Sequence, residues 1–122
     1  MCHVLIIEDE PFIALAIRAM LEEEGATSFD FAFTQAEAVE AALARRPELI
    51  TSDVKLLEGT GPEAVAQIYG RLGPVPVIYI SATPGECKPC DPSSVVLGKP
   101  VREQALKEAF HQVRAGVPAQ PI

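Results

Sequence analysis

Short apolar runs alternate along the chain with longer segments of helical spacing. The run HVLIIE, residues 3–8, is continuously apolar up to its last position. Such a run is typical of a strand that is covered on both faces of a parallel sheet. One other run, SFDFAF, alternates with a period of two, which also favours a strand. The pattern predicts strands at 3–8, 28–33, 47–54, 74–81 and 94–99.

The segments between these runs carry helix start and stop signals. Pro11 follows an acidic residue that can cap a helix, and Gly25 is a natural stop. Thr34 and Thr60 each stand three residues before a glutamate, which is the spacing of a capping box. The last segment places apolar residues at helical spacing. The predicted helices run over 11–25, from Gln35 to about Arg45, from the second capping box to about Leu72, and over 101–116.

This alternation predicts an α/β fold, an open five-stranded parallel sheet with helices on both faces. In such sheets ligands bind beyond the carboxyl ends of the strands, near the point where the strand order reverses. Polar residues stand at those predicted strand ends, so residues far apart in sequence would meet in one crevice. They are Glu8, Asp9, Asp53, Ser81 and Lys99.

Composition and charge narrow the class of protein. The 122 residues fit one domain, which we place at 1–115 with a disordered tail at 116–122. The net charge of −7 argues against a nucleic-acid binder, which needs a basic surface. No apolar run has the length of a membrane span, and the N-terminus lacks a signal-peptide pattern. Three cysteines are too few for a secreted disulfide framework, so we expect a cytoplasmic protein without a membrane partner.

The strand-end set has a definite chemistry. Carboxylates are hard oxygen ligands suited to Mg²⁺, which binds one or two of them together with phosphate oxygens. An aspartate can also act as a nucleophile and form an aspartyl phosphate. A lysine ammonium and a serine hydroxyl can contact the oxygens of a transferred phosphoryl group. Because carboxylates sharing a pocket repel one another, we expect at least one of them to have a raised pKa when no metal is bound.

Four motifs then identify a family. LIIEDE, SDVKLLEGTG, YISA and LGKP, in this order at strand ends, resemble the receiver domain of two-component response regulators. The resemblance runs from Val4 to about Ala115 and implies a flavodoxin-like sheet. The overall pattern looks closest to single-domain regulators of alphaproteobacteria and to the receiver half of that group's general-stress regulators.

The resemblance also implies a role for each strand-end residue. Asp53 would be the phosphoacceptor, and Mg²⁺ would be held by Glu8, Asp9, Asp53 and the backbone carbonyl of Lys55. Ser81, Lys99 and the backbone of Ala82 would contact the phosphoryl group. Pro100 matches a proline that often follows a cis bond in the family.

The expected function is that of a stand-alone receiver that accepts a phosphoryl group from a sensor histidine kinase or a phosphotransfer protein. It would act as a phosphate sink or by docking on a downstream protein, and it would be an enzyme only for its own phosphorylation and dephosphorylation. An interaction module that no longer signals through phosphate is the first alternative. A phosphatase with Asp53 as nucleophile is a weaker one, because Lys55 stands where its general-acid aspartate should be.

The sequence departs from the family in three places. Leu57 replaces a usual proline after the phosphoacceptor, and Val96 replaces the usual aromatic residue three positions before Lys99. Without that aromatic ring, the usual coupling of phosphorylation to a surface change is expected to be absent. Prolines between Ser81 and the last strand also predict that the fourth helix of the family is missing or reduced to a turn, because each would cost an interior helix position about 3 kcal/mol.

The pair Cys87 and Cys90 forms a C-x-x-C motif inside this proline-rich segment. A thioredoxin-like redox pair requires the first cysteine at a helix N-terminus, and a zinc site requires four ligands. Neither requirement is met by the surrounding residues. We therefore interpret these residues as loop cysteines without a dedicated role, with redox sensing as the alternative.

Overall fold

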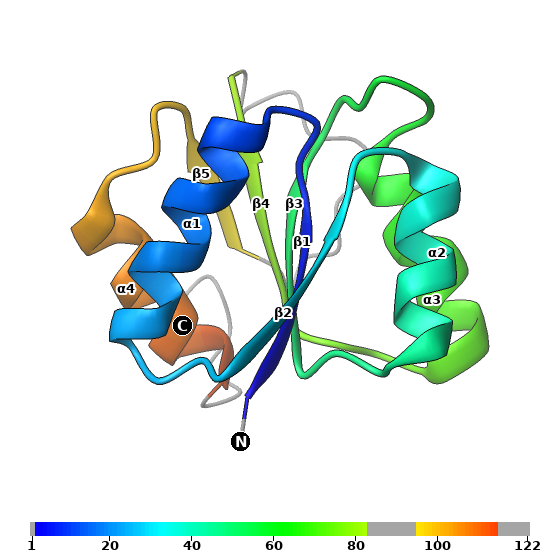
Figure 1. Cartoon of the computed structure of the whole chain (residues 1–122), viewed down its shortest axis with the longest axis horizontal. Coiled ribbons are helices and arrows are strands. Elements are labelled where there is room, and N and C mark those ends of the chain that lie inside the picture. Colours follow the sequence, from blue (N-terminus) through cyan, green and yellow to red (C-terminus); the bar gives the residue numbers. More distant parts are fainter. Residues whose placement is uncertain (1, 83–94, 115–122) are drawn as a thin grey trace, which may run out of the picture.

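The computed structural model describes residues 2–82 and 95–114. Within them one parallel sheet has the strand order β2-β1-β3-β4-β5 (Figure 1). The strands are β1 (His3–Ile7), β2 (Ser28–Ala32), β3 (Leu49–Asp53), β4 (Val77–Ser81) and β5 (Val95–Gly98). The helices are α1 (Pro11–Glu23), α2 (Gln35–Ala44), α3 (Gly61–Leu72) and α4 (Glu103–Arg114). The predicted five-stranded α/β fold is confirmed.

Both faces of the sheet are covered, which explains the continuous apolar run of the first strand. Figure 1 shows α1 and α4 on one side of the sheet and α2 and α3 on the other. Val4 and Ile6 of β1 pack into the core beneath α1 and α4. Leu5 and Ile7 pack into the core beneath α2 and α3. Successive side chains of one strand therefore enter two different cores, and none of these four positions tolerates a polar residue.

Local hydrogen bonds set the helix starts. The Thr34 side chain accepts a hydrogen bond from the backbone N–H of Glu37 at 3.1 Å, and Thr60 does the same for Glu63 at 3.2 Å. The two predicted capping boxes thus have their N-cap bonds. By contrast, Glu10 at the N-cap of α1 makes no side-chain cap bond. The cap expected there is wrong, and an acidic residue of this segment serves a different purpose at the site described below.

Some sequence predictions lie outside the described residues. The degraded fourth helix falls on 83–94, as do Cys87 and Cys90, and the predicted tail falls on 116–122. The Lys99–Pro100 peptide bond is cis. None of the helices in the described ranges is long and apolar enough to cross a membrane.

Gly61 fixes how closely α3 approaches the end of β3. A Cβ atom at this position would lie 1.9 Å from the carbonyl oxygen of Asp53 and 2.2 Å from Oγ of Ser52. The backbone N–H of Gly61 donates to the carbonyl of Val54 at 2.9 Å, which closes the loop after β3. The absence of a side chain at Gly61 therefore allows α3 to hold the end of β3 in place.

We predict that Gly61→Ala destabilises the fold, by about 1–3 kcal/mol, because a methyl group must displace the backbone of Asp53. Gly70→Ala in the same helix is the matched control, since nothing lies within 4 Å of a Cβ there. That change should stabilise the protein by about 0.5–1 kcal/mol through helix propensity. Urea unfolding of both variants measures the difference. Equal stabilities of the two variants would contradict the close approach.

Candidate functional site

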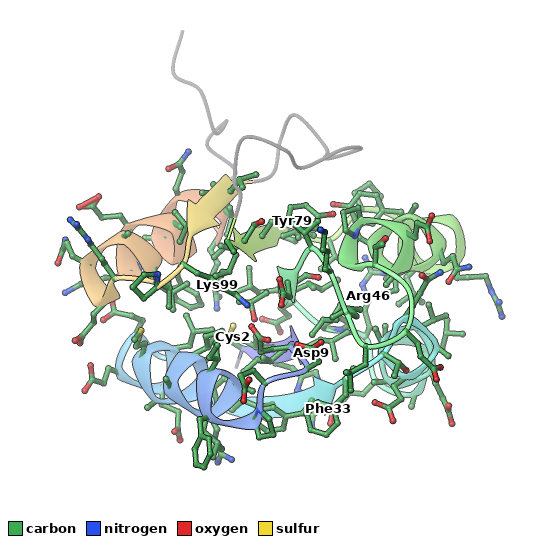
Figure 2. All side chains as sticks on the ribbon, turned by 90° about the horizontal axis from the view of Figure 1, so that it is seen from above. Cys2, Asp9, Phe33, Arg46, Tyr79 and Lys99 are labelled. Carbon is green, nitrogen blue, oxygen red and sulfur yellow. The ribbon has the colours of Figure 1, made fainter. Side chains whose placement is uncertain are left out.

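Three carboxylates and one ammonium meet at the carboxyl edge of the sheet. Glu8 and Asp9 directly follow β1, Asp53 ends β3, and Lys99 directly follows β5. One ligand oxygen from each of the three carboxylates lies within 4.8 Å of the others. In Figure 2, Asp9 and Lys99 both lie near the middle of the molecule, between the two helix layers. The predicted convergence of Glu8, Asp9, Asp53 and Lys99 is therefore found in the structure.

Lys99 joins two of the carboxylates. Its Nζ atom lies 2.9 Å from Oδ2 of Asp53, to which it donates a hydrogen bond, and 3.2 Å from Oε1 of Glu8. Burial alone would lower the pKa of Lys99, but the hydrogen bond and charge of Asp53, with a further contribution from Glu8, raise it. The lysine therefore stays charged at neutral pH. Its single positive charge faces three carboxylates, so the site has an excess of negative charge.

Glu8 is the buried member of the group, with 1% of its surface exposed. Its Oε2 atom accepts a hydrogen bond from the backbone N–H of Glu10 at 3.1 Å. Its Oε1 atom has no hydrogen bond within the described residues and only the ion pair with Lys99. Burial, followed by the charge of Asp53, raises the pKa of Glu8 to about 7. The expectation of a raised pKa in this pocket is thus met by Glu8.

Asp53 is held firmly but remains accessible. Its Oδ1 atom accepts a hydrogen bond from the backbone N–H of Val54 at 2.8 Å, while Oδ2 faces Lys99. The side chain is 12% exposed. A carboxylate in this state is fixed in orientation and can still be reached from solvent by a reactant.

The donor set fits a hard divalent cation. An under-bonded buried oxygen of Glu8 and the neighbouring oxygens of Asp9 and Asp53 offer carboxylate ligands to one point. Mg²⁺ binds through one or two such carboxylates and keeps several waters. Lys55, whose carbonyl was the fourth predicted ligand, lies on the loop after β3 and forms a β-bridge with Thr60.

Ser81 and Ala82 lie at the same edge. Ser81 ends β4 and is buried, and its neighbour Ile80 is in register with Asp53. The carbonyl of Ser81 accepts a hydrogen bond from the backbone N–H of Lys99 at 2.9 Å, which ties β4 to the lysine. Ala82 follows in an exposed position. Both residues are thus on the side of the sheet where the carboxylates meet.

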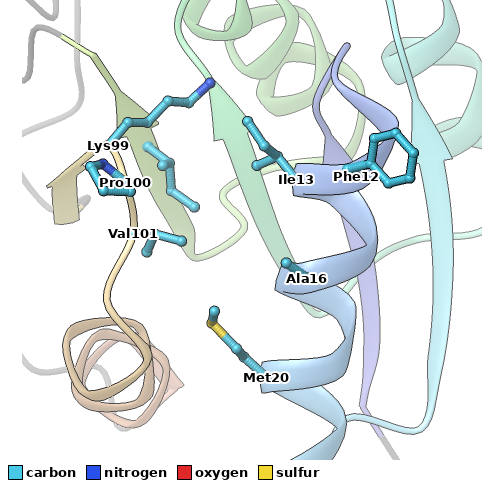
Figure 3. A pocket seen from close by; sticks show the side chains of 8 residues that line it. Phe12, Ile13, Ala16, Met20, Lys99, Pro100 and Val101 are labelled. Atoms are coloured by element: carbon cyan, nitrogen blue, oxygen red, sulfur yellow. The ribbon is translucent and has the colours of Figure 1, made fainter.

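An apolar groove of about 480 Å³ lies beside this site, between α1 and the segment after β5. Figure 3 shows Ala16 and Met20 of α1 on the side of the helix that faces Pro100 and Val101. Phe12 also borders the groove and is 83% exposed. The apolar character of the first helix, which the sequence made visible, therefore extends to its outer surface.

His3 has polar partners that its spacing in the sequence does not indicate. Its ring nitrogens lie 2.8 Å from Oγ of Ser28 and 2.9 Å from Oδ2 of Asp30. Arg45 donates a further hydrogen bond to Ser28. This group sits at the starts of β1 and β2, at the opposite end of the sheet from the carboxylates, and it ties these two strands together. Only the parallel register of His3 with Ser28 reveals it.

Comparison with known proteins gives a consistent result. Residues 4–111 match the model of the response regulator receiver domain. Over 84 residues the chain is 42% identical to the phyllosphere-induced regulator PhyR of Methylorubrum extorquens, an alignment covering 67% of this chain and 31% of that protein. It is 39% identical over 82 residues to the KDP operon transcriptional regulatory protein KdpE of Escherichia coli, covering 67% of this chain and 36% of KdpE. The chain thus spans about a third of the length of these curated relatives.

Solved structures agree with the sequence relatives. The receiver domain of Erythrobacter litoralis PhyR superimposes with a TM-score of 0.83 at 29% identity, over 99% of this chain and 95% of that one. The response regulator PhyR of Brucella abortus gives a TM-score of 0.82 at 30% identity, over 93% of this chain and 48% of that one.

The raised pKa of Glu8 predicts a pH-dependent stability in the absence of metal. The folded protein binds a proton at Glu8 up to pH of about 7, whereas the unfolded chain loses it near the model value of 4.5. The stabilisation is therefore complete below about pH 4.5 and is lost as the pH rises through 7, by up to about 3 kcal/mol. Urea unfolding in a chelator between pH 5 and 8 measures this slope.

Glu8→Gln should remove most of that slope, because the amide does not titrate. Glu40→Gln, at an exposed position on α2, should keep the slope of the wild type. A wild-type slope that Glu8→Gln leaves unchanged would show that another group titrates.

Proposed function

The chain belongs to the response regulator receiver family, and from this premise we propose that it accepts a phosphoryl group on Asp53 in a Mg²⁺-dependent reaction. One observation carries the proposal: Lys99 contacts Asp53 and Glu8 at once, beside a three-carboxylate group that fits the metal. A structural ion pair would need one carboxylate. The excess of negative charge at this edge is instead suited to a cation and a reacting phosphoryl group.

Each residue of the site has a distinct part in this reaction. Asp53 attacks the phosphorus atom through a carboxylate oxygen, and the phosphohistidine nitrogen of the donor leaves. Lys99 moves its hydrogen bond to a phosphoryl oxygen, and Ser81 and the backbone of Ala82 contact the others. Glu8, Asp9, Asp53 and the carbonyl of Lys55 would hold Mg²⁺, which when bound offsets the charge of the carboxylates and the phosphoryl oxygens. Positioning and electrostatics account for most of the rate.

The output is proposed to be a protein–protein contact. The PhyR of Bartonella quintana, 32% identical with a TM-score of 0.81, is described as an anti-anti-sigma factor, which is a role exercised through protein partners. For this chain we propose a downstream protein partner and a phosphate-donor kinase or phosphotransfer protein. The chain's expected stand-alone action and cytoplasmic location stay predictions.

The second candidate function is a receiver-like interaction module, and Val96 is the observation that favours it. Val96 packs partly buried against the core beneath α2 and α3, in register with the buried Tyr79. It has no ring to move between two positions, so phosphorylation would need another route to the surface. The intact charged group at Asp53 favours the phosphoacceptor.

We predict that acetyl phosphate with Mg²⁺ adds the mass of one phosphoryl group to the wild type, measured on the intact protein. Asp53→Asn should not gain this mass, because an amide is not a nucleophile here. Asp30→Asn, a half-exposed carboxylate at the far end of the sheet, is the control and should react as the wild type does. Modification that survives Asp53→Asn, or a wild type that never reacts, would support the interaction module.

The outer surface of α1 is proposed as the docking surface for the phosphate donor. Phe12 and Leu15 are 83% and 54% exposed on this helix, next to the carboxylate site. Large exposed apolar side chains of this kind mark protein interaction sites.

We predict that Leu15→Glu slows phosphotransfer from the donor protein roughly tenfold, as the loss of an interface anchor costs about 1–2 kcal/mol. Phosphorylation by acetyl phosphate should be unchanged. Leu43→Glu on α2, 39% exposed in the wild type, is the matched control on the other side of the sheet. If Leu15→Glu and Leu43→Glu transfer at the same rate, the donor docks elsewhere.

A further inference from the structure

Gln35 connects the start of α2 to the loop that follows β3. Its backbone N–H donates to the carbonyl of Glu58 at 3.0 Å, and its side-chain Oε1 accepts from the backbone N–H of Thr60 at 3.1 Å. Its Nε2 donates to Oε1 of Gln67 on α3 at 3.3 Å. One residue of α2 thus bonds to two backbone positions of residues 54–60, which we name the β3–α3 loop, and to one position on α3.

The side chain of Gln35 packs directly on the loop backbone. A Cβ atom at Gly59 would lie 2.3 Å from Oε1 of Gln35 and 2.6 Å from its Cβ. Gly59 also has a φ angle of 82°, which side chains other than glycine rarely adopt. The turn closes with a hydrogen bond from the N–H of Leu56 to the carbonyl of Gly59 at 3.3 Å. The glycine therefore makes room for the glutamine.

This contact reaches the site through Thr60. Thr60 receives the bond from Gln35 at its N–H, caps α3 with its side chain, and forms the β-bridge with Lys55. Lys55 is the residue whose carbonyl is the proposed fourth metal ligand. The chain of contacts therefore runs from α2 through Gln35 and Thr60 to Lys55.

We propose that Gln35 is a positioning residue, which holds the β3–α3 loop so that the Lys55 carbonyl faces the carboxylate site. This inference rests on the proposed Mg²⁺ function. Gln35 does not contact the carboxylates in any described hydrogen bond, so it acts through the loop alone. Partners that orient a metal ligand typically affect metal affinity about 10–100-fold.

The test compares three variants of the full chain. Gln35→Met keeps the length of the side chain and removes the acceptor for Thr60. Gln35→Glu keeps that acceptor and loses the donor to Gln67. Gln67→Met removes the same side-chain pair from the other end and leaves the bond to Thr60 intact. Mg²⁺ affinity is measured by calorimetric titration, and exchange of the Thr60 amide proton is measured by NMR in a chelator.

The expected results separate the two variants of Gln35. Gln35→Met should weaken Mg²⁺ binding about tenfold and speed exchange of the Thr60 amide in the absence of metal. Gln35→Glu and Gln67→Met should stay close to the wild type in both measurements. A melting temperature taken in the chelator shows whether Gln35→Met is still folded. If it is not, faster exchange confined to the loop in Gln35→Ser against Gln35→Glu decides the same point.

Two failures are distinguishable. If the wild type binds Mg²⁺ and Gln35→Met binds it equally well, the positioning role is overturned while the proposed function stands. If the wild type binds no Mg²⁺, the proposed function fails, and the inference fails with it.

Discussion

The ion pair of Lys99 with Asp53 and Glu8 is the interaction on which the site depends. Lys99 follows the edge strand β5, Asp53 ends the central strand β3, and Glu8 follows β1. The three side chains thus join strands that are not all neighbours, across the carboxyl edge of the sheet. Two charges about 4 Å apart interact by about 4 kcal/mol at an effective dielectric of 20. With three carboxylates around one ammonium, repulsion persists, and the raised pKa of Glu8 is its visible result.

That residual repulsion links folding to function. A group arranged only for stability would balance its charges, whereas this one keeps a carboxylate that is buried and under-bonded. The close approach of Gly61 to Asp53 and the contact of Gln35 with the β3–α3 loop hold the neighbouring backbone. The scaffold therefore supports an arrangement that a cation and a phosphoryl group would stabilise, at some expense to the free energy of unfolding in their absence.

Much of this fold follows from the sequence because its signals are local. The buried strand HVLIIE and the two T-x-x-E capping boxes have the same meaning in any context, and each was found where predicted. The parallel sheet then brings Glu8, Asp53 and Lys99 together, since all of them stand at strand ends. The identity of the site could therefore be predicted from the order of its motifs.

The remaining features depend on contacts between distant segments, which no local pattern encodes. The bonds of Gln35 to the loop across 25 residues of chain, and those of His3 to Ser28 and Asp30, require the register of the folded sheet. The failed cap at Glu10 shows the opposite case. An acidic residue before a helix is a local signal, but here the backbone N–H of Glu10 is taken by Glu8. Tertiary charge placement outweighs the local preference.

The central claim is that the edge of the sheet around Asp53 is a magnesium site, and the melting temperature measured against Mg²⁺ concentration tests it most directly. Because Mg²⁺ would bind only the folded chain, a concentration ten times the dissociation constant should stabilise it by about 1.4 kcal/mol. Asp53→Asn and Glu8→Gln should respond less, and Ca²⁺-free potassium chloride of equal ionic strength should not substitute. A wild-type melting temperature that millimolar Mg²⁺ leaves unchanged would contradict the account.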